Sequence, residues 1–287
     1  MTDITPLIER IAARLGQIDG VVAVVLGGSR ARGAARRDSD IDLGIYYRPA
    51  HCPSLRALAQ ELDDRHPTDA VTDYGEWGPW INGGAWLVID GHHVDWLFRD
   101  LDRVQRTIAA CRAGEPTCDY QVGHPHGFHN HIYMGEVHHC RLLHDPNGTL
   151  ATLQQATAEY PVPLKRALIN RYLFEAHFSL FIARKAVDGG DTFYVAGCLF
   201  RGVACLVQVL FALNERYFVN EKGAVAAIDG CALRPAGFGA SVAAMLGQTG
   251  ADAGQLRASL QQLGALIDAV QQLCGEWVTP NFGTLPA

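Results

Sequence analysis

The length, composition and charge of the chain indicate a folded protein of two domains and exclude a disordered or fibrous one. The chain has 287 residues, about twice the common domain size of ~100–150 residues. Hydrophobic residues make up 48% of it and charged residues 19%, and its formal net charge at pH 7 is -6. Because a general nucleic-acid binder carries a basic face, this charge argues against nucleic acid as a partner and favours a small or cationic one.

Three features of the sequence bear on the compartment. The eight cysteines are too sparse for a disulfide scaffold and include no Cys-x-x-Cys pair, which favours a reducing compartment. Residues 193–213 are apolar and long enough to cross a bilayer, but Arg201 and Gln208 interrupt them at a high cost in a membrane. Asp3 and Glu9, with no apolar segment beside them, predict no signal peptide. We therefore expect a cytoplasmic protein with no membrane partner, in which residues 193–213 form the central helix of a bundle.

Helix and strand patterns alternate along the first half of the chain. Thr5 is the expected N-cap of the first helix, with Pro6 in its first turn. Asp90-Gly91 is typical of a two-residue turn between hairpin strands. The order α-β-α-β-α-β-β-α predicts an α/β (α+β) domain with a mixed sheet. The apolar patterns predict helices at 5–15, 55–62 and 101–111, and strands at 21–26, 41–47, 86–89 and 92–98.

The second half of the chain is nearly all helical. The turn cluster at residues 145–148 predicts a boundary between a first domain, 1–148, and a second domain, 149–287. Long helices are expected at 164–187 and 192–213. Asp252-x-x-Gln255 is a capping box, followed by an apolar stripe with helical spacing. The second domain is therefore predicted to be an α-helical bundle that binds the acceptor of the reaction.

A glycine-serine turn and two acids suggest a phosphate site with bound metal. Gly27-Gly28-Ser29 follows the first predicted strand, and Asp40 and Asp42 stand where the next one begins. Residues two apart in a strand face the same side, so these carboxylates project together and repel each other. Mg²⁺ takes carboxylate oxygens readily, and paired ions stabilise the attacking and leaving oxygens of a phosphoryl displacement. The turn offers backbone N–H groups and a hydroxyl to a phosphate chain.

Asp95 is the expected third acid of this site. The hairpin around Asp90-Gly91 pairs Trp86 with Asp95 and sets Asp95 on the face opposite its apolar neighbours. Neighbouring strands lie ~4.8 Å apart, so Asp95 can reach the same metals and accept a proton from an attacking hydroxyl. Glu76 and Glu136 are the next candidates for the base.

These motifs together resemble the DNA polymerase β-type nucleotidyltransferase superfamily. Residues 28–33, GSRARG, followed by residues 38–43, DSDIDL, look most like the aminoglycoside and lincosamide nucleotidyltransferases and related bacterial proteins. The resemblance implies transfer of a nucleoside monophosphate, AMP from ATP or another NTP, to a hydroxyl of a small-molecule acceptor, with release of pyrophosphate. It implies that Gly28 and Ser29 hold the triphosphate. It also implies that two Mg²⁺ ions bind Asp40 and Asp42, with Asp95 as third ligand and base.

Further residues are candidates for substrate contacts. Gly27 belongs to the phosphate turn, Arg30 to a basic loop beside it, and Lys222 to a loop that we expect to close over the nucleotide. A solvated surface is the alternative for both cations. Trp77, Trp80 and Trp86 either wall a ring-binding cleft or pack in the core.

Other interpretations of the same motifs remain open. Gly27-x-Ser29-x-Ala31 nearly matches the nucleophile elbow of α/β-hydrolases, but that pattern leaves the two acids at 40 and 42 unexplained. The acceptor of a nucleotidyltransferase can also be a protein hydroxyl or an RNA end. A nucleotide-binding regulatory module without turnover is a third alternative, although such a module does not need the base. The sequence predicts no oligomeric state.

A histidine cluster is a weaker metal candidate. Its spacings, with Cys118 and Cys140 nearby, match no established zinc module, so roles in packing or in lining a cleft are favoured over zinc. Seven of the twelve histidines make up this cluster, namely His124, His126, His129, His131, His138, His139 and His144.

Overall fold

The computed structural model describes residues 4–36, 39–61 and 70–279 of the chain. The chain folds into two compact units. Unit 1 runs past the predicted boundary at residue 148, because the segment up to Glu159 packs with the first half of the chain. Unit 1 comprises Met1–Ala110, Cys118–Gly123 and Gly127–Glu159, and unit 2 comprises Cys111–Thr117, His124–His126 and Tyr160–Ala287.

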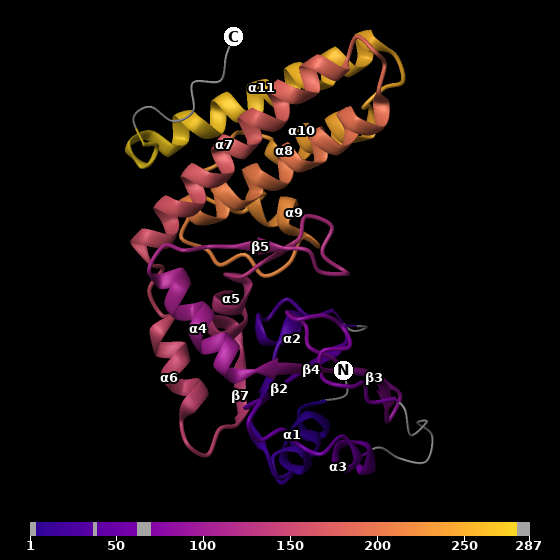
Figure 1. Cartoon of the computed structure of the whole chain (residues 1–287), viewed down its shortest axis with the longest axis vertical. Helices are drawn as coiled ribbons and strands as arrows, with labels where there is room; N and C mark the ends of the chain where they lie inside the picture. Colours follow the sequence, from indigo (N-terminus) through magenta and orange to yellow (C-terminus); the bar gives the residue numbers. More distant parts are fainter. Residues whose placement is uncertain (1–3, 37–38, 62–69, 280–287) are drawn as a thin grey trace. The chain divides into compact units, whose positions relative to one another are not determined.

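A five-stranded mixed sheet, in the order β3-β4-β2-β1-β7, forms the centre of unit 1 (Figure 1). The strands are β1 (Val21–Leu26), β2 (Ile41–Tyr47), β3 (Gly84–Ile89), β4 (His92–Asp100) and β7 (Arg141–His144). β2 and β4 run parallel, whereas the other neighbouring pairs are antiparallel. The mixed sheet confirms the predicted fold class of this domain. β7, at the edge beside β1, was not predicted from the sequence.

Six helices and a small ladder complete the described part of unit 1. The helices are α1 (Thr5–Leu15), α2 (Gly28–Ala31), α3 (Leu55–Gln60), α4 (Leu101–Arg112), α5 (Ile132–His139) and α6 (Thr149–Ala156), and the ladder is β5 (Cys118–Asp119) with β6 (Phe128–His129). The last two residues of α4 fall in unit 2. Residue 62, the predicted end of the third helix, lies outside the described residues.

The start of α1 differs from the prediction by one residue. Ile4, not Thr5, occupies the N-cap position, and no side chain caps the helix there. Thr5 is the first helical residue and Pro6 the second, where a missing N–H leaves no intrahelical bond unmade. The proline therefore sets the start of the helix without a side-chain cap.

The two faces of the sheet differ in chemistry. Ile41, Leu43 and Ile45 of β2 are fully buried in one hydrophobic cluster with residues of β4, α1 and α3. Burial of such a side chain stabilises the fold by ~1.5–3 kcal/mol, so this core face fixes the alternation of both strands. Because side chains alternate in a strand, Asp42 and Asp95 lie on the opposite face, called the acid face from here on.

Unit 2 is a helical bundle, as predicted (Figure 1). α7 and α8 pack along each other, and α11 packs on both. Gly202 of α8 allows the close approach of α11, because a Cβ there would lie 2.8 Å from Cδ2 of Leu263. The helices are α7 (Val162–Ala186), α8 (Thr192–Leu213), α9 (Ala224–Asp229), α10 (Phe238–Gly247) and α11 (Ala253–Cys274), followed by a 3₁₀ turn at Gly275–Trp277.

Two predictions for the bundle are met. Among the residues that the structure describes, only α8 is long and apolar enough to cross a membrane, with a mean hydropathy of 2.0, but 72% of that window is buried inside the protein. Burial of this kind is typical of a central bundle helix. At the start of α11, the side chain of the N-cap Asp252 accepts a hydrogen bond from the Gln255 N–H at 2.9 Å, as a capping box requires. Gln255 Oε1 accepts its bond from the Ala251 N–H, one residue before the N-cap, so the reciprocal half of the box is shifted by one residue.

Candidate active site

The structure brings the three predicted acids near one another, with Asp42 and Asp95 on the acid face and the charge of Asp40 acting on both. Asp42 of β2 and Asp95 of β4 are direct partners in the parallel ladder, so their side chains leave neighbouring strands side by side. Both are half-buried, whereas Asp40, one residue before β2, is exposed. The predicted pairing of Trp86 with Asp95 across the hairpin is also present.

Burial and the charges of nearby acids raise the pKa values of Asp42 and Asp95. Burial raises the pKa of Asp42, and the Asp40 carboxylate raises it further, while Arg32 and Arg30 act in the opposite direction. Burial also raises the pKa of Asp95 to about 6, with repulsion from Asp42 and then Asp40 adding to the effect. Ionised carboxylates are therefore destabilised here unless a cation neutralises them. Such a set of carboxylate oxygens fits a hard divalent cation such as Mg²⁺.

The glycine turn lies directly against Asp42. The Gly27 N–H donates a hydrogen bond to the Asp42 carbonyl oxygen at 2.8 Å. Gly28 has a φ of +60°, and a Cβ on it would lie 1.8 Å from Oδ2 of Asp42. Only glycine fits both the backbone conformation and the contact. The half-buried Ser29 follows Gly28 in the single turn of α2.

Arg30 contacts the segment that carries Asp40. Its Nε donates to the Asp40 carbonyl oxygen at 2.9 Å, and its Nη2 donates to the Ser39 carbonyl oxygen. The side chain thereby ties α2 to the start of β2 and fixes the backbone of the first acid. The sequence indicated only a positive charge here, so this positioning role was missed. A contact between Arg30 and a phosphate stays a prediction.

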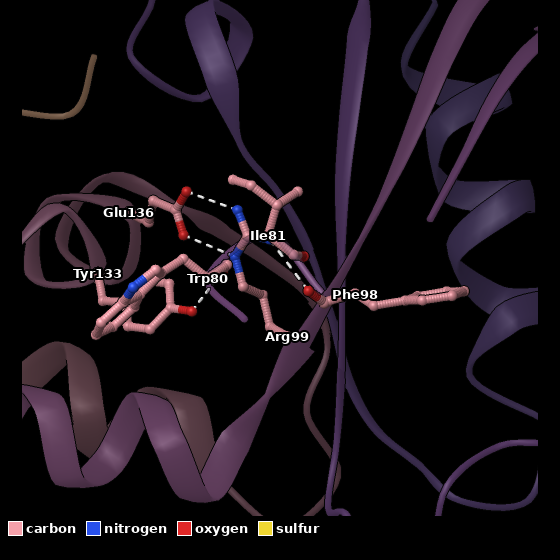
Figure 2. Close-up of polar contacts among 6 residues, drawn as sticks. All are labelled: Trp80, Ile81, Phe98, Arg99, Tyr133 and Glu136. Atoms are coloured by element: carbon pink, nitrogen blue, oxygen red, sulfur yellow. Dashed lines mark hydrogen bonds and ion pairs between the residues drawn. The ribbon is translucent and has the colours of Figure 1, made fainter. Parts of the chain in front are cut away.

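A buried ion pair lies farther along the acid face. Arg99 of β4 is 3% exposed, and its guanidinium donates to both carboxylate oxygens of Glu136 on α5, at 2.7 and 2.9 Å (Figure 2). It also donates to the carbonyl oxygens of Ile81 and Phe98. Figure 2 shows the side chains of Phe98 and Arg99 on opposite sides of β4. The pair fastens α5 to the sheet at this end, while the Asp42 and Asp95 end is less deeply buried.

Both alternative bases have structural partners. Glu136 is engaged by Arg99 through both oxygens, and its charge contributes to the raised pKa of Asp42. Glu76 is exposed, and its Oε2 accepts a hydrogen bond from the Asp73 N–H at 2.9 Å within a turn. Asp95 therefore remains the best placed of the three candidate bases.

The comparison with protein families agrees with this geometry. Residues 8–74 match the model of the nucleotidyltransferase domain. The chain carries a nucleotidyltransferase domain. The expectation of a nucleotidyltransferase is thereby confirmed. The matched segment includes the glycine turn, Asp40 and Asp42, while Asp95 lies beyond it.

The other comparisons add less. Residues 130–222 match a domain of unknown function, DUF4037. No curated protein matches the chain. The structure is similar to the crystal structure of a nucleotidyltransferase-like protein from Exiguobacterium sibiricum 255-15. The two share 8% sequence identity with a TM-score of 0.46, and the match covers 94% of this chain and 78% of the other.

The three tryptophans that were candidates for a ring-binding cleft have different surroundings. Trp80 packs against Phe128 and Tyr133, with ring centroids 5.1 and 5.7 Å away, so packing explains it. Trp77 and Trp86 instead stack on each other, and Trp86 is 70% exposed.

Lys222 belongs to unit 2. It is exposed in the turn before α9, where its N–H donates to Asn220 Oδ1 at 2.7 Å. Its contact with a nucleotide stays a prediction.

The histidine cluster divides between the two units. In unit 1, His138 Nδ1 bonds the Thr157 carbonyl oxygen at 2.8 Å, and in unit 2 His124 Nδ1 lies 3.0 Å from Glu221 Oε2. Zinc binding by this cluster stays untested by these contacts.

One group in the described part of the chain has metal-like spacing, with ligand atoms of His126, Glu175 and Cys205 within 4.8 Å of one another. Arg201 donates to Glu175 and neutralises it, so we interpret the group as a buried polar network. Burial, followed by the charge of Arg201, lowers the pKa of His126 to about 4.

Proposed function

We propose that the chain transfers a nucleoside monophosphate, AMP from ATP in the first instance, to a hydroxyl group of a small-molecule acceptor and releases pyrophosphate. The observation that carries the proposal is the direct pairing of Asp42 with Asp95 in neighbouring strands, with the glycine turn against Asp42. A phosphate-binding turn beside clustered carboxylates is the arrangement that metal-assisted phosphoryl chemistry needs.

The nucleotide would bind at the glycine turn. The backbone N–H of Gly28 and the hydroxyl of Ser29 would hold the triphosphate, since a turn without side chains allows close approach. Gly27 would line the phosphate site while its own N–H stays bonded to the Asp42 carbonyl oxygen. Arg30, half-buried beside the turn, would add positive charge. The nucleotide-binding part of the proposal thus requires no rearrangement of the turn.

Asp40, Asp42 and Asp95 would hold two Mg²⁺ ions. When bound, the ions neutralise charge on the phosphates and on the attacking and leaving oxygens. Asp95 would accept the proton of the acceptor hydroxyl. The acceptor oxygen forms a bond to the α-phosphorus while the bond from the α-phosphorus to the bridging oxygen of the β-phosphate breaks. Pyrophosphate leaves with that oxygen.

The acceptor would be a small molecule with a hydroxyl, in the manner of an aminoglycoside- or lincosamide-like compound. The motif at residues 28–43 supports this class by resemblance, and the net charge of -6 disfavours nucleic acid. We place the reaction in the cytoplasm, in line with the cysteine spacing. Transfer to a protein or RNA hydroxyl, and nucleotide sensing without turnover, are the alternatives.

The test follows pyrophosphate release from each labelled NTP with Mg²⁺ and pooled small-molecule hydroxyl acceptors. Wild type should release pyrophosphate and label an acceptor, and Asp42→Asn should lose at least 100-fold in rate. Asp90→Asn is a matched control, because it makes the same chemical change in the hairpin turn, where the φ of 51° suits asparagine. Equal turnover by Asp42→Asn and wild type would overturn the proposal. Nucleotide binding without any turnover would favour the sensor.

A further inference from the structure

An exposed tryptophan stands next to the proposed base. Trp86 is the direct partner of Asp95 in the antiparallel ladder of β3 and β4, so both side chains lie on the acid face. Side chains of such a pair have Cβ atoms ~4.5–5.5 Å apart. Although Trp86 is 70% exposed, its neighbours Ala85 and Leu87 on the core face are buried. The indole ring of Trp86 is thus exposed to solvent beside a candidate catalytic carboxylate.

A second tryptophan holds this ring in place. Trp77 stacks on Trp86 with ring centroids 4.3 Å apart and ring planes within 18°. Gly84 makes room for Trp77 against β3, since a Cβ on Gly84 would lie 3.1 Å from the Trp77 ring. The Trp77 carbonyl oxygen accepts a hydrogen bond from Gln121, which is 3% exposed. The stacked pair is therefore fixed before any ligand binds, which reduces the entropy cost of binding.

The strand order places this pair on one side of the proposed reaction. Across the sheet, the glycine turn follows β1, Asp42 lies on β2, Asp95 on β4 and Trp86 on β3. In a phosphoryl transfer the attacking and leaving oxygens are roughly in line. If the leaving pyrophosphate is held at the turn, the attacking hydroxyl comes from the side of β4 and β3. Trp86 lies on that side.

We propose that the Trp77–Trp86 stack is the binding platform for the acceptor, and that the acceptor is a small molecule with a planar ring near its reacting hydroxyl. This inference narrows the small-molecule class of the proposed function to planar-ring compounds and replaces the saturated rings of an aminoglycoside- or lincosamide-like acceptor. The inference rests on the proposed function, because that function assigns the glycine turn to the nucleotide. An aromatic face binds a planar ring by stacking and by covering apolar area. The ring stacks on the exposed part of Trp86, and the hydroxyl next to it reaches Asp95.

The first arm of the test needs no turnover. Protein with ¹⁵N-labelled tryptophan is titrated with 4-hydroxybenzyl alcohol, a planar ring with a hydroxyl, and with glycerol, a polyol without a ring. The Trp86 indole signal is assigned by its loss in Trp86→Phe. The ring compound should shift the Trp86 signal in a saturable way, and glycerol should not. No shift with the ring compound, or equal shifts with both, overturns the inference.

The second arm uses steady-state kinetics with Mg²⁺·ATP and the acceptor that the pyrophosphate screen identifies. Trp86→Ala should raise KM for the acceptor about tenfold or more, and Trp86→Phe should restore most of it. Val88→Ala is the matched control, an exposed residue on the same face of the same strand, and should leave this KM unchanged. A rise in KM for ATP rather than for the acceptor assigns the stack to the nucleobase and overturns the inference.

The two proposals fail in different ways. If wild type neither binds Mg²⁺·ATP nor releases pyrophosphate, the proposed function fails. If wild type turns over normally while Trp86 gives no shift and Trp86→Ala leaves the acceptor KM unchanged, only the platform fails.

Discussion

Asp42 and Asp95 are direct partners in neighbouring parallel strands, and the pKa of each is raised by burial and by the charge of the other acids. Gly28 lies against Asp42 so closely that no other residue fits there. The fold therefore holds carboxylates that repel each other close together, beside a glycine turn that has no side chains. Groups that destabilise a fold in this way are expected where function requires them.

Neutralising Asp42 should stabilise the protein in the absence of metal. The pKa of this acid is raised in the folded state, so its ionised form destabilises the fold at pH 8. Asp42→Asn removes that charge and should raise Tm at pH 8 in EDTA. Mg²⁺ with ATP should raise the Tm of wild type but not that of the variant. Thermal melts in EDTA and in Mg²⁺·ATP measure both effects, and a lower Tm for the variant in EDTA contradicts the electrostatic account.

Gly28→Ala should abolish activity for a steric reason that a second glycine can isolate. Gly28 and Gly33 both have positive φ, of 60° and 69°, but only Gly28 has a neighbour that an added Cβ would meet. Each alanine should cost ~1–2 kcal/mol in the free energy of unfolding from backbone strain. Only Gly28→Ala should also lose turnover, by at least 100-fold, because its Cβ displaces the Asp42 carboxylate. Urea unfolding and pyrophosphate assays test this, and similar turnover in both variants would count against it.

Arg30→Ala should weaken metal binding more than Arg32→Ala. Both arginines lower the pKa of Asp42 through their charge, but Arg30 also donates to the backbone of Ser39 and Asp40. Both variants lose a positive charge that repels the metal, but loss of those bonds should also loosen the start of β2, so Arg30→Ala should bind Mn²⁺ about tenfold more weakly than Arg32→Ala. Calorimetric titration of both variants measures the difference. Equal affinities would mean that Arg30 acts by charge alone.

His126 should make the protein sensitive to acid. Burial and the charge of Arg201 lower its pKa from the usual 6.5 to about 4, and the charge of Glu221 opposes this shift. The unfolded chain therefore binds a proton at a higher pH than the folded one, so stability is lost as pH falls from 6.5 towards 4. At pH 4.5 the loss from this residue is about 2–3 kcal/mol relative to pH 7.5.

His126→Gln, which stays neutral, should reduce the drop in unfolding free energy between pH 7.5 and 4.5 by about that amount. An undiminished drop in His126→Gln, measured by urea unfolding at both pH values, would show that His126 does not set the acid lability.

The parts of the fold that could be predicted depend on local patterns. Apolar alternation identifies β2, and Asp90-Gly91 identifies the hairpin, so together they place Asp95 opposite Trp86. The short β7 and α5 have no such pattern, since β7 has four residues and α5 eight. Their place in the sheet and on the acid face depends on long-range packing.

The candidate site divides in the same way. Spacing in the sequence was enough to propose Asp40, Asp42 and Asp95 as one group. It did not reveal the contact of Gly28 with Asp42 or the hydrogen bonds of Arg30, because both join the turn to the next strand in space. The burial of Arg99 depends on Glu136, which lies 37 residues farther along the chain. No local pattern predicts such a pair.

The most direct test of the central claim is the affinity of Mn²⁺ for wild type and for Asp42→Asn in the presence of a non-hydrolysable ATP analogue, measured by electron paramagnetic resonance. The account predicts that wild type binds Mn²⁺ more tightly when the nucleotide analogue is present. Asp42→Asn should lose at least 100-fold in Mn²⁺ affinity, and Asp90→Asn should bind Mn²⁺ like wild type. Equal Mn²⁺ affinity in wild type and Asp42→Asn would contradict the claim that these carboxylates hold the catalytic metal.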